Sequence, residues 1–421
     1  MTRNRRIGPV VAASFVAGFV IAAAFTVVFF AGAKEHAITG AALLAFALGW
    51  ALLAAGSARW TDQPQRWAVV PAGLMGLVGA GLLIFAPGPS ALQTLGWVWP
   101  PALLVLVAWM TLQSRRQLRS RTRRWLLYPV FGLLALASLG GAVETAQESL
   151  QGGALPAGGR LVDVGGHRLY LRCTGSGSPV VVLEAGLGAD SSAWNTIAPT
   201  LARETRVCSY DRAGRGRSES APESRHAVQT AAELRTLLTR AGEPGPYVLV
   251  GHSLGGAYVL DFAKEFPADV AGIALVDSMS PDQFTILPSY AGFYNVLQRA
   301  SGLLPSLARL GIGRIIGSSA RDARGFRDDV SEIPGALRQA QALESIGGKP
   351  LIVITAVKGQ EDGWPVAQDD LAKLSTNSVH RVVPSATHDS LVDDGAEAAV
   401  SSGAIRDLVR AVRAAAPLSA S

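Results

Sequence analysis

The pattern of hydrophobic and polar positions divides the 421-residue chain into two parts. The first third consists of long apolar runs separated by short polar segments. Uninterrupted apolar runs of about 20 residues are typical of transmembrane helices. The pattern therefore predicts an all-α transmembrane bundle over residues 1–143, with about five spans, or four if the short last span lies at the interface. The predicted spans cover residues 7–33, 37–57, 67–87, 91–113 and 125–143.

The distribution of charge predicts the orientation of these spans. Residues 1–143 contain 12 Lys and Arg but only 2 Asp and Glu. The arginines lie before the first predicted span, between the second and third, and between the fourth and fifth. Their positions are Arg3, Arg5, Arg6, Arg59, Arg66, Arg115, Arg116, Arg119, Arg121, Arg123 and Arg124. Positive loops stay cytoplasmic, so we expect a multi-pass cytoplasmic membrane protein whose N-terminus is cytoplasmic and whose C-terminal part is extracytoplasmic.

The same pattern argues against two other functions. The basic residues belong to membrane loops, so we expect no nucleic acid as a partner. No acidic or histidine residue lies inside a predicted span, which argues against an ion or proton path and against a transporter. The lipid bilayer is therefore the expected partner of this region, with the spans acting as an anchor.

The remaining residues alternate short apolar runs with amphipathic segments. Residues 144–160 are polar and glycine-rich and are predicted to form a linker. Within residues 161–421, short runs such as 247–250 predict buried strands, and residues 226–241 predict an amphipathic helix. Alternating strands and helices predict an α/β domain with a mostly parallel sheet covered on both faces.

One strand of this domain is followed by a motif that carries chemistry. Gly251-His252-Ser253-Leu254-Gly255 lies between a predicted strand and a predicted helix. In this context a G-x-S-x-G sequence forms a sharp turn that exposes the serine hydroxyl. We therefore expect Ser253 to be a nucleophile, with the Leu254 N–H as a donor to an oxyanion.

Four motifs in order give residues 160–415 a resemblance to the α/β-hydrolase superfamily, of the serine hydrolase or esterase type. The motifs are residues 183–187, residues 210–218, residues 251–255 and residues 387–389. The resemblance implies an eight-stranded sheet of order 1-2-4-3-5-6-7-8 and a helical cap at about residues 278–349. Relatives that open epoxides or remove halogens carry an aspartate at the position of Ser253, which argues for ester chemistry here.

The resemblance also implies a catalytic triad and an oxyanion hole. His388 follows the last strand, where the family carries its base. The acid is expected after the sixth strand, at Asp277, with Glu361 or Asp362 as the alternative placement after the seventh. The second oxyanion donor is expected to be the Leu187 N–H. Here the chain departs from the family, because Ala185 replaces a histidine and leaves the support of that loop in doubt.

The two cysteines lead to two further expectations. Cys173 and Cys208, the only cysteines, would lie on neighbouring strands of the implied sheet, and disulfides persist in exported domains, so we expect a bond between them. Both lie far in the sequence from the predicted base, so no metal and no cofactor are expected.

The combined prediction is a membrane-anchored serine hydrolase that cleaves carboxylic esters. The predicted cap is rich in apolar residues, which would suit an apolar or lipid-derived substrate but would equally suit ordinary helix packing. Acyltransferase or peptidase chemistry at the same site stays open. A non-catalytic, membrane-tethered sensor or scaffold is the alternative from another functional class.

Overall fold

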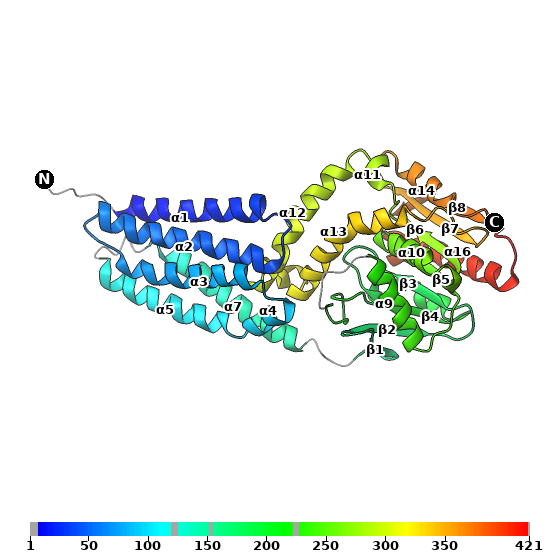
Figure 1. Ribbon diagram of the computed structural model, residues 1–421, viewed down its shortest axis with the longest axis horizontal. Helices are drawn as coiled ribbons and strands as arrows, with labels where there is room; N and C mark the ends of the chain where they lie inside the picture. Colours follow the sequence, from blue (N-terminus) through cyan, green and yellow to red (C-terminus); the bar gives the residue numbers. More distant parts are fainter. Residues whose placement is uncertain (1–6, 119–124, 151–154, 222–226, 420–421) are drawn as a thin grey trace. The chain divides into compact units, whose positions relative to one another are not determined.

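The computed structural model describes residues 7–118, 125–150, 155–221 and 227–419. Its chain forms two compact units, one of residues 1–152 with 296–327 and one of residues 153–295 with 328–421. Each unit is described by itself, and Figure 1 shows the elements of both. The predicted loop arginines Arg3, Arg5, Arg6, Arg119, Arg121, Arg123 and Arg124 lie outside the described residues.

The first unit contains the long apolar helices. Its elements before residue 152 are α1 (Ile7–Ala24), η1 (Phe25–Phe29), α2 (Glu35–Trp60), η2 (Arg66–Ala68), α3 (Val69–Phe85), α4 (Pro89–Leu95), α5 (Trp99–Gln117) and α7 (Tyr128–Leu150). Among the described residues, four helices are long and apolar enough to cross a membrane, and they cover 7–29, 35–60, 66–85 and 128–150. The pair α4 and α5 would make a fifth span, but it bends by 42°. The break precedes Pro100 and Pro101, which lack the N–H that a continuous helix needs.

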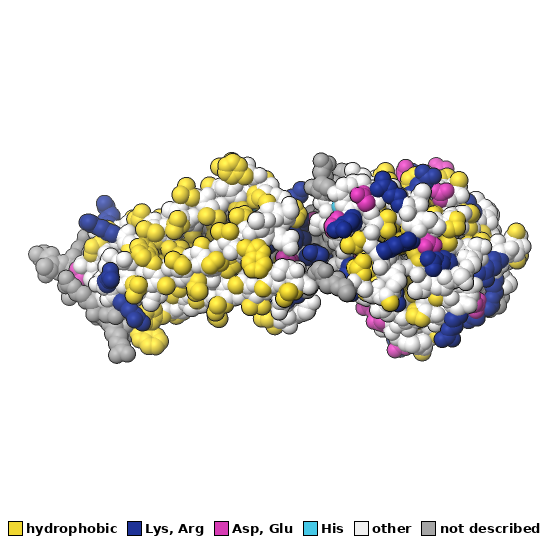
Figure 2. All heavy atoms as spheres, turned by 90° about the horizontal axis from the view of Figure 1, so that it is seen from below, with side chains coloured by type: hydrophobic (Ala, Val, Ile, Leu, Met, Phe, Trp, Pro, Cys, Tyr) yellow, Lys and Arg dark blue, Asp and Glu magenta, His cyan; other side chains and the backbone are white. Residues whose placement is uncertain are grey.

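Close backbone approach and aromatic packing hold these helices together. A Cβ atom added to Gly40 of α2 would lie 2.9 Å from the Gly79 oxygen of α3, so only glycine allows this contact. Trp50 packs edge-on against Phe15 at 4.9 Å between ring centres. The visible outer face of the unit is largely hydrophobic (Figure 2), and Leu77 of α3 is 75% exposed. Such a surface suits lipid rather than water.

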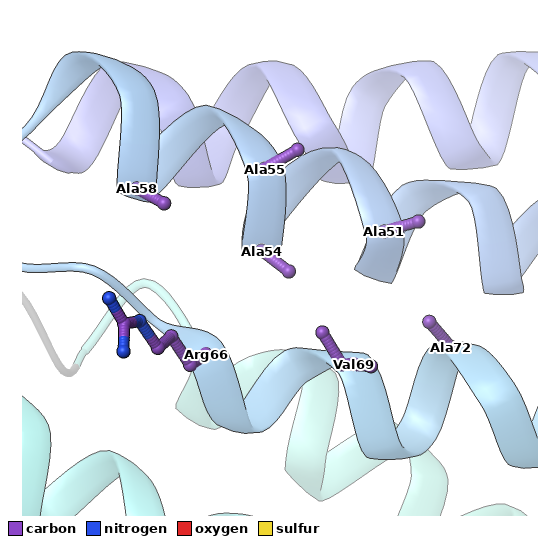
Figure 3. Close-up of a pocket in the computed structure, with 7 residues that line it drawn as sticks. All are labelled: Ala51, Ala54, Ala55, Ala58, Arg66, Val69 and Ala72. Carbon is purple, nitrogen blue, oxygen red and sulfur yellow. The ribbon is translucent and has the colours of Figure 1, made fainter.

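A cavity of about 340 Å³ lies between α2 and α3. Figure 3 shows four alanines of α2 on one side, Val69 and Ala72 of α3 on the other, and Arg66 at one end. Apart from Arg66, its lining is made of Ala and Val side chains, so it reflects the packing of small residues rather than a site for chemistry.

The last apolar helix is longer than the sequence pattern predicts. The span was expected to end at Val143 and to be followed by a linker over 144–160, but α7 continues to Leu150. Glu144 and Glu148 are buried in this extension. They stay helical and buried because residues 296–327, which belong to this unit, supply arginine partners. The predicted cap at 278–349 is therefore divided, since its central part groups with the apolar helices.

The second unit is built on one eight-stranded sheet. The strands are β1 (Gly159–Asp163), β2 (Arg168–Thr174), β3 (Val181–Glu184), β4 (Val207–Tyr210), β5 (Tyr247–His252), β6 (Val270–Val276), β7 (Leu351–Lys358) and β8 (Ser378–Thr387). Their order is β1-β2-β4-β3-β5-β6-β7-β8, which confirms the predicted order. The pairs β1–β2 and β2–β4 are antiparallel, and the others are parallel.

Helices cover both faces of the sheet because side chains alternate along each buried strand. In β5, Leu249 belongs to one hydrophobic cluster, whereas Val248 and Val250 belong to the other. The first cluster includes α9 (Ala227–Arg240), α10 (Leu254–Glu265) and α14 (Trp364–Ala372). The second includes η3 (Ser191–Trp194), α8 (Ala198–Leu201), α15 (Ser390–Asp393) and α16 (Gly395–Ala414). The short η4 (Pro267–Asp269) leads into β6.

The long connection between β6 and β7 is helical. It contains α11 (Gln283–Ile286), α12 (Tyr290–Arg309), η5 (Ile312–Ile316) and α13 (Ala320–Ala340). Ser253, Asp277 and His388 follow the carboxyl ends of β5, β6 and β8. These ends lie at one edge of a parallel sheet, which is where ligands bind in open α/β folds.

Candidate active site

Ser253 occupies the sharp turn between β5 and α10. Its backbone has φ 55° and ψ −126°, a conformation that a non-glycine residue adopts only when its surroundings force it. The turn needs small neighbours: a Cβ atom added to Gly251 would lie 2.6 Å from the Gly255 oxygen, and one added to Gly255 would lie 2.4 Å from the Glu184 oxygen. The motif thus places the serine where the sequence predicts it.

Asp277 and His388 meet at this edge of the sheet. The Oδ2 atom of Asp277 lies 2.6 Å from Nδ1 of His388. The Asp277 side chain is completely buried, whereas the His388 side chain is 37% exposed. Because Nδ1 of His388 faces the carboxylate, Nε2 is the nitrogen of this ring that can accept a proton.

Three further donors hold the Asp277 carboxylate. They are the Ala356 N–H at 3.0 Å, the Trp364 indole N–H at 2.9 Å and the Gln360 amide at 2.7 Å. All three lie on β7 or just after it, so this end of the strand fixes the position of the Asp277 carboxylate. A buried carboxylate that accepts several hydrogen bonds is fixed in position.

The alternative acids lie elsewhere. Glu361 accepts a hydrogen bond from the hydroxyl of Ser289, and Asp362 is exposed. Neither has a hydrogen bond or ion pair with His388 among the described residues. The strand β7 runs on to Lys358, and Gln360 then turns its side chain toward Asp277, which leaves Glu361 to face the solvent side of the turn.

The two predicted oxyanion donors flank the serine. Leu254 is the first residue of α10, and the first N–H groups of a helix have no partner within it. Leu187 follows Gly186, where an added Cβ atom would lie 3.0 Å from the Ser253 Cβ. Among the described residues the Leu187 N–H donates no hydrogen bond, so it is available to a ligand.

A buried arginine supports this loop, and the sequence pattern did not reveal it. Arg212 donates to the carbonyl oxygens of Ala185 at 2.6 Å and Gly186 at 2.9 Å. It also donates to Glu184 at 2.5 Å and to Asp329 at 2.9 Å. The sequence indicated only that Arg212 belongs to the motif at residues 210–218. Its pairing with carboxylates distant in sequence needed the tertiary structure.

The charge on Arg212 is secured by its neighbours. Burial by itself would lower the pKa of Arg212, but the carboxylates of Asp329 and Glu184 outweigh this effect and hold the pKa well above its usual range. The guanidinium thus stays charged and keeps its planar set of donors. It thereby supplies side-chain support to the loop at Ala185 and Gly186.

His252 is a second residue whose role sequence reasoning missed. Its Nε2 lies 3.1 Å from the backbone oxygen of His388, and the two rings are 4.6 Å apart between centres. Burial, followed by the proximity of His388, lowers the pKa of His252 to about 4. At neutral pH the ring is therefore uncharged, and it donates its Nε2–H to the carbonyl of the residue that it positions.

One group of side chains here has the composition of a metal site. Ligand atoms of His252, His388 and Asp389 all lie within 4.8 Å of one another. However, the Nε2 of His252 faces a carbonyl oxygen and the Nδ1 of His388 faces a carboxylate, and both nitrogens are protonated in such pairs. The lone pair of each ring therefore lies on its other nitrogen, Nδ1 of His252 and Nε2 of His388, and the absence of a metal stays a prediction.

Cys173 and Cys208 lie opposite each other on β2 and β4. Their sulfur atoms are at bonding distance, 2.08 Å. The antiparallel register of these strands brings together two residues that are 35 positions apart in the sequence.

Comparisons with known proteins agree with this architecture. Residues 179–353 match the alpha/beta hydrolase fold family. The chain is 32% identical over 228 residues to the uncharacterized protein C23C11.06c of Schizosaccharomyces pombe, which covers 48% of this chain and 42% of that protein. It is 27% identical over 190 residues to the uncharacterized protein YbdG of Bacillus subtilis, covering 44% and 57%. The chain thus spans about half the length of these relatives.

A solved structure shows the same fold. A crystal structure of DBJA, the mutant called dbja delta, superposes with a TM-score of 0.51 at 16% identity and covers 61% of this chain and 99% of that one. At this identity the likeness concerns the fold alone. Residues 159–414 have the alpha/beta hydrolase fold, and the chain joins this fold to an N-terminal region with four apolar helices.

Proposed function

We propose that the chain is a membrane-anchored serine hydrolase that cleaves carboxylic esters at Ser253. The observation that carries the proposal is the pairing of Asp277 with His388 at 2.6 Å, at the sheet edge where the strained serine turn also lies. A serine hydroxyl needs a base to become a nucleophile, and the base needs a group that fixes its tautomer.

In the proposed reaction the Ser253 oxygen attacks the ester carbonyl, and Nε2 of His388 takes the hydroxyl proton. The N–H groups of Leu254 and Leu187 stabilise the oxyanion. The same proton then passes to the leaving alcohol. Water, deprotonated by His388, releases the acid and restores the serine.

In the proposed mechanism the hydrogen bond between the Ser253 hydroxyl and His388 forms when substrate binds. Among the described residues the Ser253 hydroxyl makes no hydrogen bond, whereas the ring of His388 is already oriented by Asp277. Catalytic hydrogen bonds are often long without substrate and shorten in the reacting complex.

We propose that the apolar helices anchor this enzyme in the cytoplasmic membrane, with the hydrolase unit outside. Their length and composition support the anchor, and the loop arginines support the orientation. The cysteine pair of β2 and β4 supports it independently, because disulfides form outside the cytoplasm. A substrate with an apolar acyl group fits an enzyme held at a bilayer.

Labelling of the full-length protein with a fluorophosphonate probe tests the proposal. We expect Ser253 to be labelled, and labelling to disappear in Ser253→Ala. A matched control is Ser289→Ala, which removes an exposed hydroxyl paired with Glu361 and should leave labelling unchanged. Esters of rising acyl length then define the substrate.

Absence of labelling in a correctly folded wild-type protein would favour the non-catalytic scaffold instead. Hydrolysis of amides rather than esters, or transfer of the acyl group to an alcohol in place of water, would identify the peptidase or acyltransferase alternative.

A further inference from the structure

Residues 305–324, here called the tip segment, comprise the end of α12, the short η5 and the start of α13. The segment belongs to the same compact unit as the apolar helices. It carries four arginines, and three of them are paired with carboxylates of those helices. The pairs are Arg309 with Glu35, Arg314 with Glu144 at 2.5 Å, and Arg324 with Glu35 at 3.3 Å and Glu148 at 3.7 Å.

These ion pairs are buried and supplemented by backbone donors. Side chains of Glu35, Glu144 and Glu148 are at most 4% exposed. Glu144 also accepts from the Ala320 N–H at 2.7 Å, and Glu148 accepts from the Arg321 N–H at 2.9 Å. The complementary charges thus neutralise one another, which is the condition for ionised groups to lie at a membrane.

The tip segment touches the backbone of the apolar helices. A Cβ atom added to Gly140 of α7 would lie 2.2 Å from the Leu310 oxygen. A hydrogen bond of 2.9 Å joins Ser306 to Thr39 of α2. Glycine-mediated approach of this kind is typical of helix packing in membranes.

These contacts place the segment at a definite level. Gly140 lies three residues, or about 5 Å, before Val143, the last residue of the apolar run of α7, although the helix itself continues to Leu150. Thr39 lies four residues into α2, or about 6 Å from its start. The tip segment therefore lies beside the outermost apolar turns of α2 and α7, at the depth expected for the headgroup and acyl boundary.

The outward face of the segment is apolar. Ile312 is 47% exposed and Ile315 is 84% exposed. The neighbouring helix α7 exposes Leu139 by 54% and Val143 by 51%, on either side of the contact at Gly140. The exposed apolar band of the spans thus continues onto the tip segment.

We propose that the tip segment is embedded in the interface of the lipid bilayer, with Ile312 and Ile315 among the acyl chains. The occupant of this face is lipid, because the face continues the surface that the spans present and because three of the segment's four arginines are paired with buried carboxylates. Interfacial elements bury apolar side chains about 5–10 Å into the headgroup boundary. The connection between β6 and β7 is then held by the membrane itself, and not only by the spans.

The inference rests on the proposed membrane location, and the test separates the two. The native cysteines are paired, so a single introduced thiol can carry the fluorophore NBD on the full-length protein. Labelled Ile315→Cys, and independently Ile312→Cys, are reconstituted in phosphatidylcholine nanodiscs with and without doxyl-labelled lipid. We expect doxyl lipid to reduce their fluorescence at least twofold.

Two labelled positions serve as controls. Leu77→Cys on α3, 75% exposed, reports on the spans, and Val400→Cys on α16, 41% exposed, reports on the hydrolase unit. Quenching at 77 without quenching at 312 and 315 would overturn the inference and indicate a protein partner or a second copy on this face. Lack of quenching at 77 would overturn the membrane location itself. Equal quenching at 400 and 315 would also count against the inference.

Discussion

The guanidinium of Arg212 and the carboxylate of Asp329 lie 2.9 Å apart, although 117 positions separate them in the sequence. Asp329 is on α13, and it also accepts the Gly188 N–H at 3.2 Å. Arg212 and Asp329 thus hold the loop of Ala185–Gly188 from two sides, and Leu187 of this loop is a proposed oxyanion donor. The helical connection between β6 and β7 thereby reaches the proposed reaction centre.

This relationship predicts the effect of Asp329→Asn. The loop should lose a charged partner of Arg212, so the oxyanion donor would be less well placed in the transition state while substrate binding changes little. We expect kcat for an activated ester to fall about 10- to 100-fold with KM nearly constant. The control Glu344→Gln, an exposed carboxylate after the same helix, should retain activity. A rise in KM alone would contradict the positioning role.

Replacement of the proposed acid should be severe. In Asp277→Asn the amide oxygen should stay with the N–H groups of Ala356 and Trp364, so that the amide NH2 faces Nδ1 of His388 and donates to it. This favours the wrong tautomer of His388, and we expect kcat to fall roughly 10³- to 10⁴-fold. Glu361→Gln and Asp362→Asn should stay within about threefold of the parent. Steady-state ester hydrolysis measures all three variants. Full turnover by Asp277→Asn would show that another group orients His388.

A buried carboxyl outside the site predicts a pH dependence of stability. Asp261 on α10 is 1% exposed, and neither of its side-chain oxygens has a hydrogen-bond partner among the described residues. Burial raises the pKa of Asp261 from 3.8 to about 8. Between these values the folded protein binds more protons than the unfolded chain, so stability falls as pH rises from about 4 to 8, by on the order of 1 kcal/mol per unit.

The variant Asp261→Asn removes this titration. Its advantage in thermal midpoint over the parent should grow between pH 5 and pH 8, whereas the exposed neighbour Glu265→Gln should show no such trend. Unfolding of the detergent-solubilised protein at several pH values provides the measurement. A constant difference across the range would mean that Asp261 does not titrate there.

The buried pair of Glu144 and Arg314 predicts a charge-reversal effect. Glu144→Lys should place like charges together and cost about 3–5 kcal/mol of stability, since it leaves two cations without a partner. Adding Arg314→Glu should restore part of this loss, but not all, because the Ala320 N–H still requires an acceptor. The yield of monodisperse protein and its thermal midpoint measure both. If the stability losses of the two substitutions simply add in the double variant, Glu144 and Arg314 do not interact directly.

Local patterns in the sequence were sufficient for the turn at Ser253 and for the apolar helices, whereas the strand order came from the resemblance to the α/β-hydrolase superfamily. The alternation of residues along β5 and the glycines around Ser253 act over a few positions, so a reader of the sequence can recognise them. The expected pairing of Cys173 with Cys208 required only the order of two neighbouring strands.

Other features depend on side chains that meet across long distances in the chain. The sequence left Asp277, Glu361 and Asp362 as competing acids, because all three follow strands that end near His388. The conformation of the turn after β7 decides between them, because it directs the Gln360 side chain to Asp277 and the Glu361 side chain to Ser289. Likewise, the sequence predicted that Glu144 begins a polar linker. In the structure Glu144 is instead buried in a helix, because Arg314 supplies the opposite charge.

The sequence by itself determined the two-part organisation, the sheet and the position of the serine, because hydrophobic periodicity and turn chemistry are local properties. The tertiary structure decided which carboxylate faces His388, which arginine supports the loop at Leu187, and where the middle of the β6–β7 connection packs. Those choices are made by electrostatic pairing of buried groups, whose free energy depends on which partners the fold brings within a few ångströms.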